Sequence, residues 1–129
     1  MKIEVSVGEA VDRLSILEIK LERVKDPVKL ENIRAEYGLL RDAIEKAGFS
    51  CEGRVFLELK AVNQSLWDIE DRIRRKELDG EFDEEFIGLA RSVYRENDRR
   101  FEIKRRINSE AGSELVEEKE YVDYDRPDR

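Results

Sequence analysis

Apolar residues recur every three or four positions along most of the chain, a spacing typical of amphipathic α-helices. The pattern breaks at short polar connections, and it predicts four helices, at about residues 7–25, 27–47, 54–78 and 83–108. Helix N-caps are expected at Ser6, Asp26 and Asp83, and helix ends at Gly48 and Gly80. Because the connections are short, neighbouring helices must run in opposite directions. The chain is therefore expected to be all-α, an antiparallel four-helix bundle.

Two segments flank these helices. Residues 1–5 alternate apolar and polar side chains, so we expect a short extended segment at the N-terminus. Residues 113–129 form an acidic tail that carries the apolar pairs Leu115-Val116 and Tyr121-Val122. We expect this tail to be partly ordered and to pair with residues 1–5 as a short strand. With 129 residues and 40% hydrophobic side chains, residues 1–129 suit a single domain with one core.

Charge is abundant and unevenly placed. Charged residues make up 44% of the chain and the net charge is −7, so we expect neither nucleic acid nor an anionic membrane as a partner, because the long-range field repels both. Residues 91–106, however, hold seven basic and three acidic side chains, whereas residues 109–129 hold three basic and eight acidic ones. We therefore expect the basic helix and the acidic tail to meet.

Composition also narrows the chemistry. The absence of histidine excludes Ser-His-Asp and Cys-His catalytic systems. The single cysteine, Cys51, excludes an internal disulfide and is expected to be an ordinary thiol. Neither a signal peptide nor a long apolar run is evident, so a cytoplasmic location is expected. The sequence identifies neither catalytic residues nor a cofactor, and no metal ligand set is expected.

The helix expected at residues 83–108 carries polar groups on its apolar stripe. At about 100° per residue, Asn97 falls at the centre of that face, Lys104 lies almost in line with it, and Arg100 sits at the edge. The apolar members of the face are Phe86, Ala90, Val93 and Phe101. Three hydrogen-bonding side chains thus point where a packed helix normally carries Leu or Ile, and they form a candidate site.

Polar side chains on the other three helices are expected to face the same interior, namely Glu18, Arg41, Asn63 and Glu70. One hypothesis is a pocket in which Arg100, Lys104 and Arg41 bind an anionic group that the two asparagines orient. Glu18 or Glu70 then transfers a proton or holds Mg²⁺, and Trp67 stacks on a base or sugar ring. The other hypothesis is a closed network of buried salt bridges and amides that fixes helix pairing, with Trp67 as a packed aromatic. The sequence leaves both open.

The first helix has a second apolar face. Ile16 and Ile19 lie opposite its main stripe, with Asp12 between them. Either other helices or a second subunit must cover this face, so a homodimer through Ile16 and Ile19 is one expected arrangement. In a purely structural interpretation, the chain is a dimerisation module without a ligand.

Five sequence blocks occur in order: Val7–Lys20 (VGEAVDRLSILEIK), Leu66–Asp71 (LWDIED), Leu89–Arg100 (LARSVYRENDRR), Lys104–Asn108 (KRRIN) and Leu115–Tyr121 (LVEEKEY). Together they resemble a bacterial and phage domain family of unknown function. The resemblance covers nearly the whole chain and brings no catalytic residues with it. It implies a setting, surface-polysaccharide or lipopolysaccharide metabolism in the company of glycosyltransferases.

Two functional hypotheses follow. The leading one is a cytoplasmic accessory or binding domain that recognises an anionic sugar phosphate or nucleotide-sugar, or the glycosyltransferase-type enzyme that handles one. The alternative is a Mg-dependent all-α nucleotide or nucleotide-sugar phosphohydrolase, in which inward carboxylates hold the metal. Glu81-Phe82-Asp83-Glu84 matches the Glu-x-x-Glu half of the pattern of such enzymes, but no Glu-x-x-Asp half follows at a suitable distance.

Overall fold

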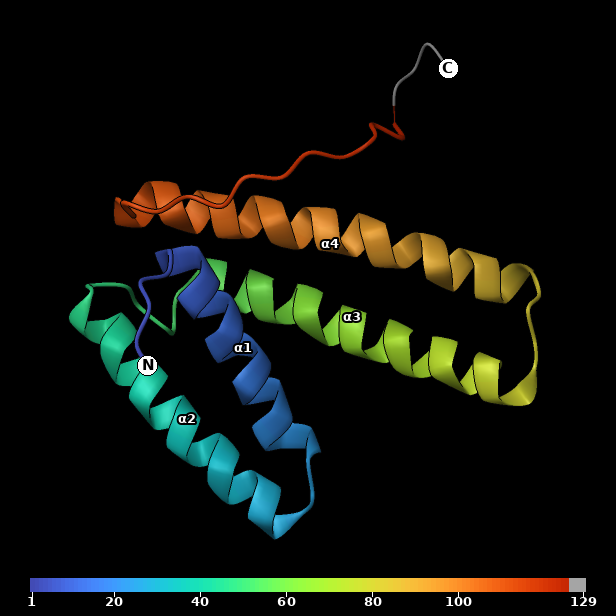
Figure 1. The fold of residues 1–129 in the computed structure, drawn as a ribbon, viewed down its shortest axis with the longest axis horizontal. Helices are drawn as coiled ribbons and strands as arrows, with labels where there is room; N and C mark the ends of the chain where they lie inside the picture. The colour runs from blue at the N-terminus through green and yellow to red at the C-terminus, as the bar shows by residue number, and fades with distance from the viewer. Residues whose placement is uncertain (126–129) are drawn as a thin grey trace.

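The computed structural model describes residues 1–125, and within them it contains α-helices and no strand. The helices are α1 (Val7–Arg23), α2 (Pro27–Lys46), α3 (Arg54–Asp79) and α4 (Glu84–Ala111). Helices α1 and α2 form one antiparallel hairpin, and α3 and α4 form a second, longer one that crosses it (Figure 1). The predicted all-α helical bundle is confirmed.

The helices begin at the residues whose side chains can cap them. The Ser6 hydroxyl accepts a hydrogen bond from the Glu9 N–H at 3.1 Å, and the Asp83 carboxylate accepts one from the Phe86 N–H at 3.0 Å. At the other end, α4 runs three residues beyond the expected Asn108, because the chain leaves the helix only at Gly112, with φ 65°. Glycine adopts this left-handed conformation without the steric cost of a Cβ.

Helix α1 is the central element. It lies close to all three other helices, whereas the backbone of α2 approaches that of α1 only. The core sits where the two hairpins cross, and its buried members are Val11, Leu14, Ile44, Cys51, Phe56, Leu59 and Ile107. The far ends of α3 and α4 extend past this core, and there Leu78, Phe82 and Ile87 are exposed. Only the halves of α3 and α4 near the crossing therefore face α1.

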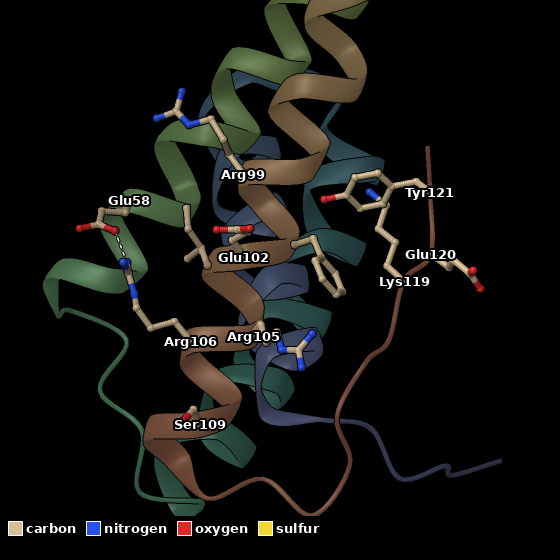
Figure 2. A pocket seen from close by; sticks show the side chains of 11 residues that line it. Glu58, Arg99, Glu102, Arg105, Arg106, Ser109, Lys119, Glu120 and Tyr121 are labelled. Atoms are coloured by element: carbon tan, nitrogen blue, oxygen red, sulfur yellow. Dashed lines mark hydrogen bonds and ion pairs between the residues drawn. The ribbon is translucent and has the colours of Figure 1, made fainter. Parts of the chain in front are cut away.

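The acidic tail lies along α4 and not beside residues 1–5. Residues 113–125 run back along α4, and Figure 2 shows Lys119, Glu120 and Tyr121 beside that helix. Residues 1–5 form no strand with them, so the predicted strand pairing is wrong. The reason is electrostatic: the tail binds the basic part of α4 through pairs such as Lys104–Glu117 at 2.7 Å and Arg95–Asp125 at 3.4 Å. The predicted meeting of basic helix and acidic tail is confirmed; residues 126–129 of the tail lie outside the described residues.

The second apolar face of α1 is largely covered within the chain. Ile19 is fully buried, with 0% of its surface exposed, while Ile16 is half-buried. Ile19 therefore cannot contribute to a subunit interface without opening the fold, which corrects its expected role, and the homodimer itself stays a prediction. Among the helices described, none contains an apolar stretch long enough to cross a membrane.

Gly8 marks the closest approach of α1 to α4. Its N–H donates a hydrogen bond to the Asn108 side-chain oxygen at 2.6 Å. A Cβ placed on Gly8 would lie 2.5 Å from the backbone oxygen of Lys104 and 2.9 Å from the Asn108 side-chain oxygen. Real Cβ atoms are not found so close to backbone, so any side chain here must push the two helices apart.

We expect Gly8→Ala to lower the free energy of unfolding by about 2 kcal/mol, the typical cost of overpacking a well-packed contact. The control is Gly38→Ala in α2, where an added Cβ meets no atom within 4 Å. Because alanine favours helix more than glycine does, this control should be neutral or stabilising by up to about 1 kcal/mol. Urea unfolding of both variants measures the difference, and equal stabilities would contradict the close approach.

Candidate functional site

A buried carboxylate lies at the meeting point of three helices. Asp12 on α1 is 2% exposed and receives two hydrogen bonds from the Arg100 guanidinium of α4, from Nε at 2.9 Å and from Nη2 at 2.5 Å. The Asn63 side chain of α3 donates a third, at 2.9 Å. The hydrogen bonds with the Asp12 carboxylate raise the pKa of the Arg100 guanidinium above its ordinary value. A charge-assisted, bidentate pair of this kind is among the stronger polar contacts in proteins.

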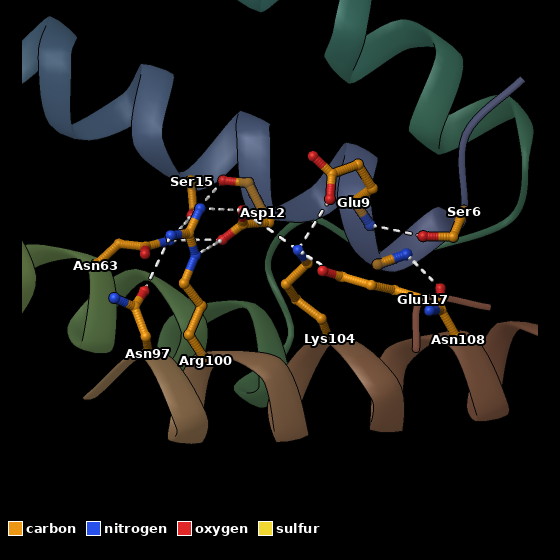
Figure 3. A network of polar contacts seen from close by, with 11 residues as sticks. Ser6, Glu9, Asp12, Ser15, Asn63, Asn97, Arg100, Lys104, Asn108 and Glu117 are labelled. Carbon is orange, nitrogen blue, oxygen red and sulfur yellow. Dashed lines mark hydrogen bonds and ion pairs between the residues drawn. The ribbon is translucent and has the colours of Figure 1, made fainter. Parts of the chain in front are cut away.

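The neighbouring polar groups are paired as well (Figure 3). The Ser15 hydroxyl accepts a hydrogen bond from Asn63 at 2.8 Å and donates one to the Asp12 backbone oxygen at 2.7 Å. The Asn97 side-chain oxygen accepts a longer contact, 3.4 Å, from Arg100 Nη1. Buried polar groups are costly unless they are hydrogen-bonded, and this cluster meets that requirement. We call Asp12, Ser15, Asn63, Asn97 and Arg100 the Asp12 network.

Lys104 continues the polar layer one helical turn further along α4. Its side chain is 9% exposed, and its ammonium lies 2.8 Å from a Glu9 oxygen and 2.7 Å from a Glu117 oxygen. A third carboxylate oxygen, from Asp12, lies at 3.9 Å. Burial opposes the charged form, but the hydrogen bonds with Glu117 and Glu9 outweigh it and raise the pKa of Lys104. The ammonium therefore stays charged at neutral pH and ties the tail to α1.

Three predicted residues, Asn63, Arg100 and Lys104, contact one patch of α1, and a fourth, Asn97, contacts Arg100 beside it. Their partners Glu9, Asp12 and Ser15 are absent from the predicted site. The sequence does carry a signal for them, since the three recur every third residue and so form one polar line along α1. This line was not recognised because Ile16 and Ile19 flank Asp12 on the same side of the helix and gave that side an apolar character.

The other predicted residues lie apart from the Asp12 network. Glu18 accepts hydrogen bonds from Lys60 at 2.8 Å and from the Tyr37 hydroxyl at 3.2 Å. Arg41 bonds the same hydroxyl at 3.0 Å, and also Glu45 and Glu52, so it belongs with Glu18 in a second cluster. The expectation that both face the same interior as Arg100 is therefore wrong, because their side chains are paired in this second cluster and not with the Asp12 network.

Glu70 and Trp67 lie further out on α3. Glu70 is exposed, with an Arg74 nitrogen 3.9 Å away on the same helix. Trp67 is half-buried, and the Arg23 guanidinium lies 5.7 Å from its ring centre. Glu70 does not reach the predicted interior because this part of the α3–α4 hairpin extends beyond α1 (Figure 1).

The surface beside the Asp12 network is hollowed. Asn97, Arg100 and Lys104 line one hollow of about 520 Å³ together with Tyr94, Phe101, Val93, Glu9, Glu117 and Lys119. On the other flank of the tail, a wider hollow of about 1020 Å³ is lined by Arg99, Arg105, Arg106 and Tyr121 among others (Figure 2). In residues 1–125, no three Cys, Asp or Glu side chains are grouped so that they could hold a metal ion.

A family model matches residues 1–126. The chain belongs to this family, DUF6165, a family of unknown function. No curated protein and no solved structure matches it significantly. The predicted resemblance to a domain family of unknown function is thus confirmed, while the bacterial, phage and glycosyltransferase setting stays a prediction.

We expect Asn63→Ala to destabilise the protein by about 2 kcal/mol, because it removes two hydrogen bonds and leaves a buried carboxylate with one donor fewer. The matched control is Asn32→Ala, an exposed position on α2, which should change stability by less than about 0.5 kcal/mol. Chemical denaturation measures both. A cost for Asn63→Ala no larger than that of the control would show that the Asp12 network contributes little to stability.

Proposed function

We propose that this DUF6165 chain is a cytoplasmic accessory domain of surface-glycan metabolism that binds an anionic sugar phosphate or nucleotide-sugar. One observation carries the proposal: Asn97, Arg100 and Lys104 line a single hollow that also contains two aromatic rings. The glycan setting rests on the sequence resemblance alone. A glycosyltransferase-type enzyme that handles the same ligand is the partner we propose.

The hollow combines the groups that such a ligand needs. Arg100 is held in place by Asp12, yet 29% of its side chain is exposed, and a guanidinium has more N–H groups than Asp12 and Asn97 use. A phosphate can therefore bind to its free edge without breaking the pair. The rings of Tyr94 and Phe101 offer apolar faces for a sugar. A preorganised cation beside aromatic surface supports recognition of a charged sugar.

The carboxylates near the hollow favour a binding function over hydrolysis, because their oxygens are already bound by groups of the protein. Hydrolysis with Mg²⁺ needs several carboxylates that converge on the metal. Asp12 is bound by Arg100 and Asn63, and Glu9 and Glu117 are bound by Lys104. Each of these carboxylates is already paired with a cation of the protein, Arg100 or Lys104, so the geometry gives the hydrolase alternative no specific support.

The test is a calorimetric titration with glucose 1-phosphate and UDP-glucose, with glucose as the uncharged control. We expect the two charged ligands to bind and to raise the unfolding midpoint, since a ligand that binds only the folded state stabilises it. Asn97→Ala should weaken binding about fivefold, the value of one hydrogen bond. Asn32→Ala on α2 should leave binding unchanged.

The proposal is contradicted if neither phosphorylated ligand binds at millimolar concentration, or if glucose binds as tightly as glucose 1-phosphate. Release of phosphate from UDP-glucose in the presence of Mg²⁺ would instead favour the phosphohydrolase. The unfolding midpoint of Asn97→Ala without ligand is measured in parallel, so that a loss of binding is not confused with a loss of fold.

A further inference from the structure

The tail and the part of α4 beneath it are strongly complementary in charge. Residues 113–125 hold six acidic side chains and one basic one, whereas residues 91–106 of α4 hold seven basic and three acidic. The tail has no helix or strand along α4, apart from its turns, and it runs antiparallel to the helix (Figure 1). This face of α4 therefore already binds one acidic, extended peptide, namely the chain's own tail.

One tyrosine provides the most specific contact. The Tyr124 hydroxyl donates a hydrogen bond to Asp98 at 2.5 Å, and its ring lies 4.7 Å from the Tyr94 ring. The Arg95 guanidinium lies 4.8 Å from the Tyr124 ring centre. The hydrogen bond to Asp98 raises the pKa of Tyr124 to about 12, so the hydroxyl keeps its proton at neutral pH. Lys119 donates a second hydrogen bond to Asp98, at 3.0 Å.

The tail is attached to α4 mainly by polar contacts and not by buried apolar side chains. Leu115, Val116 and Val122 are exposed, so its apolar side chains do not anchor it. Most of its ion pairs are at the surface, where a pair typically contributes at most about 1 kcal/mol. Hollows remain on both flanks between tail and helix. Such an attachment is reversible and sensitive to salt.

The root of the tail, in contrast, is fixed. Gly112 ends α4, the Ser113 N–H donates to the Asn108 backbone oxygen at 2.9 Å, and the Ser113 hydroxyl accepts from the Val7 N–H at 3.2 Å. The tail can therefore leave the helix beyond Ser113 while the core and the crossing of the two hairpins stay intact.

We propose that this face of α4 is a docking surface for an acidic, tyrosine-bearing extended segment of a partner protein, which replaces residues 114–125. The surface consists of Tyr94, Arg95, Asp98, Phe101, Lys104 and Arg105. Asp98 selects a peptide over a polyphosphate or nucleic acid, because it needs N–H or O–H donors and repels a bare polyanion.

The probe is a fluorescent synthetic peptide with the sequence of residues 113–125, titrated with the full chain in a polarisation assay. The wild-type tail competes at an effective concentration on the order of millimolar, so the peptide should bind weakly. Tyr124→Ala weakens the internal competitor and should tighten peptide binding roughly tenfold. Val122→Ala, an exposed position in the same tail, is the matched control and should leave the affinity unchanged.

Three further measurements complete the test. Arg95→Ala added to Tyr124→Ala should abolish the gain, and a peptide with alanine in place of the residue that corresponds to Tyr124 should bind at least about fivefold more weakly. Unfolding midpoints check that each variant is folded. The inference is overturned if Tyr124→Ala binds the peptide no more tightly than the wild-type chain, or if a thymidine 13-mer binds as tightly as the peptide. The sugar-phosphate titration uses other ligands and Asn97, so either proposal can fail alone.

Discussion

The bidentate pair between Asp12 and Arg100 joins the two helical hairpins of this protein. Asp12 belongs to the α1–α2 hairpin and Arg100 to the α3–α4 hairpin, and their contact lies beside the core at which the hairpins cross. Taking a carboxylate to 2% exposure costs several kcal/mol unless it is paired and hydrogen-bonded. Arg100 and Asn63 supply that pairing only in one relative position of the three helices. The pair therefore fixes register, which apolar packing alone specifies less sharply.

The same pair also prepares the ligand site that we propose. Because Asp12 fixes the Arg100 guanidinium, its exposed edge faces the neighbouring hollow in one orientation, and less entropy is lost when an anion binds. Lys104 adds a charge next to it and connects the tail to α1 through Glu117 and Glu9. A structural network and a ligand site are therefore compatible at Arg100. The guanidinium N–H groups that face Asp12 hold the helices together, and those on its exposed edge remain available to a ligand.

The sequence predicts most of the fold and part of the site. Helix starts at Ser6, Asp26 and Asp83 follow from local capping chemistry, which depends on a few neighbouring residues. Asn97, Arg100 and Lys104 stand out because they interrupt an apolar stripe. Glu70 was misplaced because helical periodicity gives the face of a residue and not the length over which two hairpins overlap. The predicted strand pairing of the tail was wrong because alternation indicates an extended chain but leaves its partner undetermined, whereas the charge pattern predicted the contact with α4.

A double-mutant cycle on Asp12 and Arg100 tests the central claim most directly. Asp12→Ala, Arg100→Ala and the double variant are unfolded in urea. The coupling energy is the amount by which the sum of the two single losses in unfolding free energy exceeds the loss in the double variant. If the pair joins the hairpins, Arg100→Ala leaves the buried Asp12 without its counter-charge and Asp12→Ala leaves the half-buried Arg100 without its own, and the coupling should be about 3 kcal/mol. Additive losses, with a coupling below about 0.5 kcal/mol, would contradict the account.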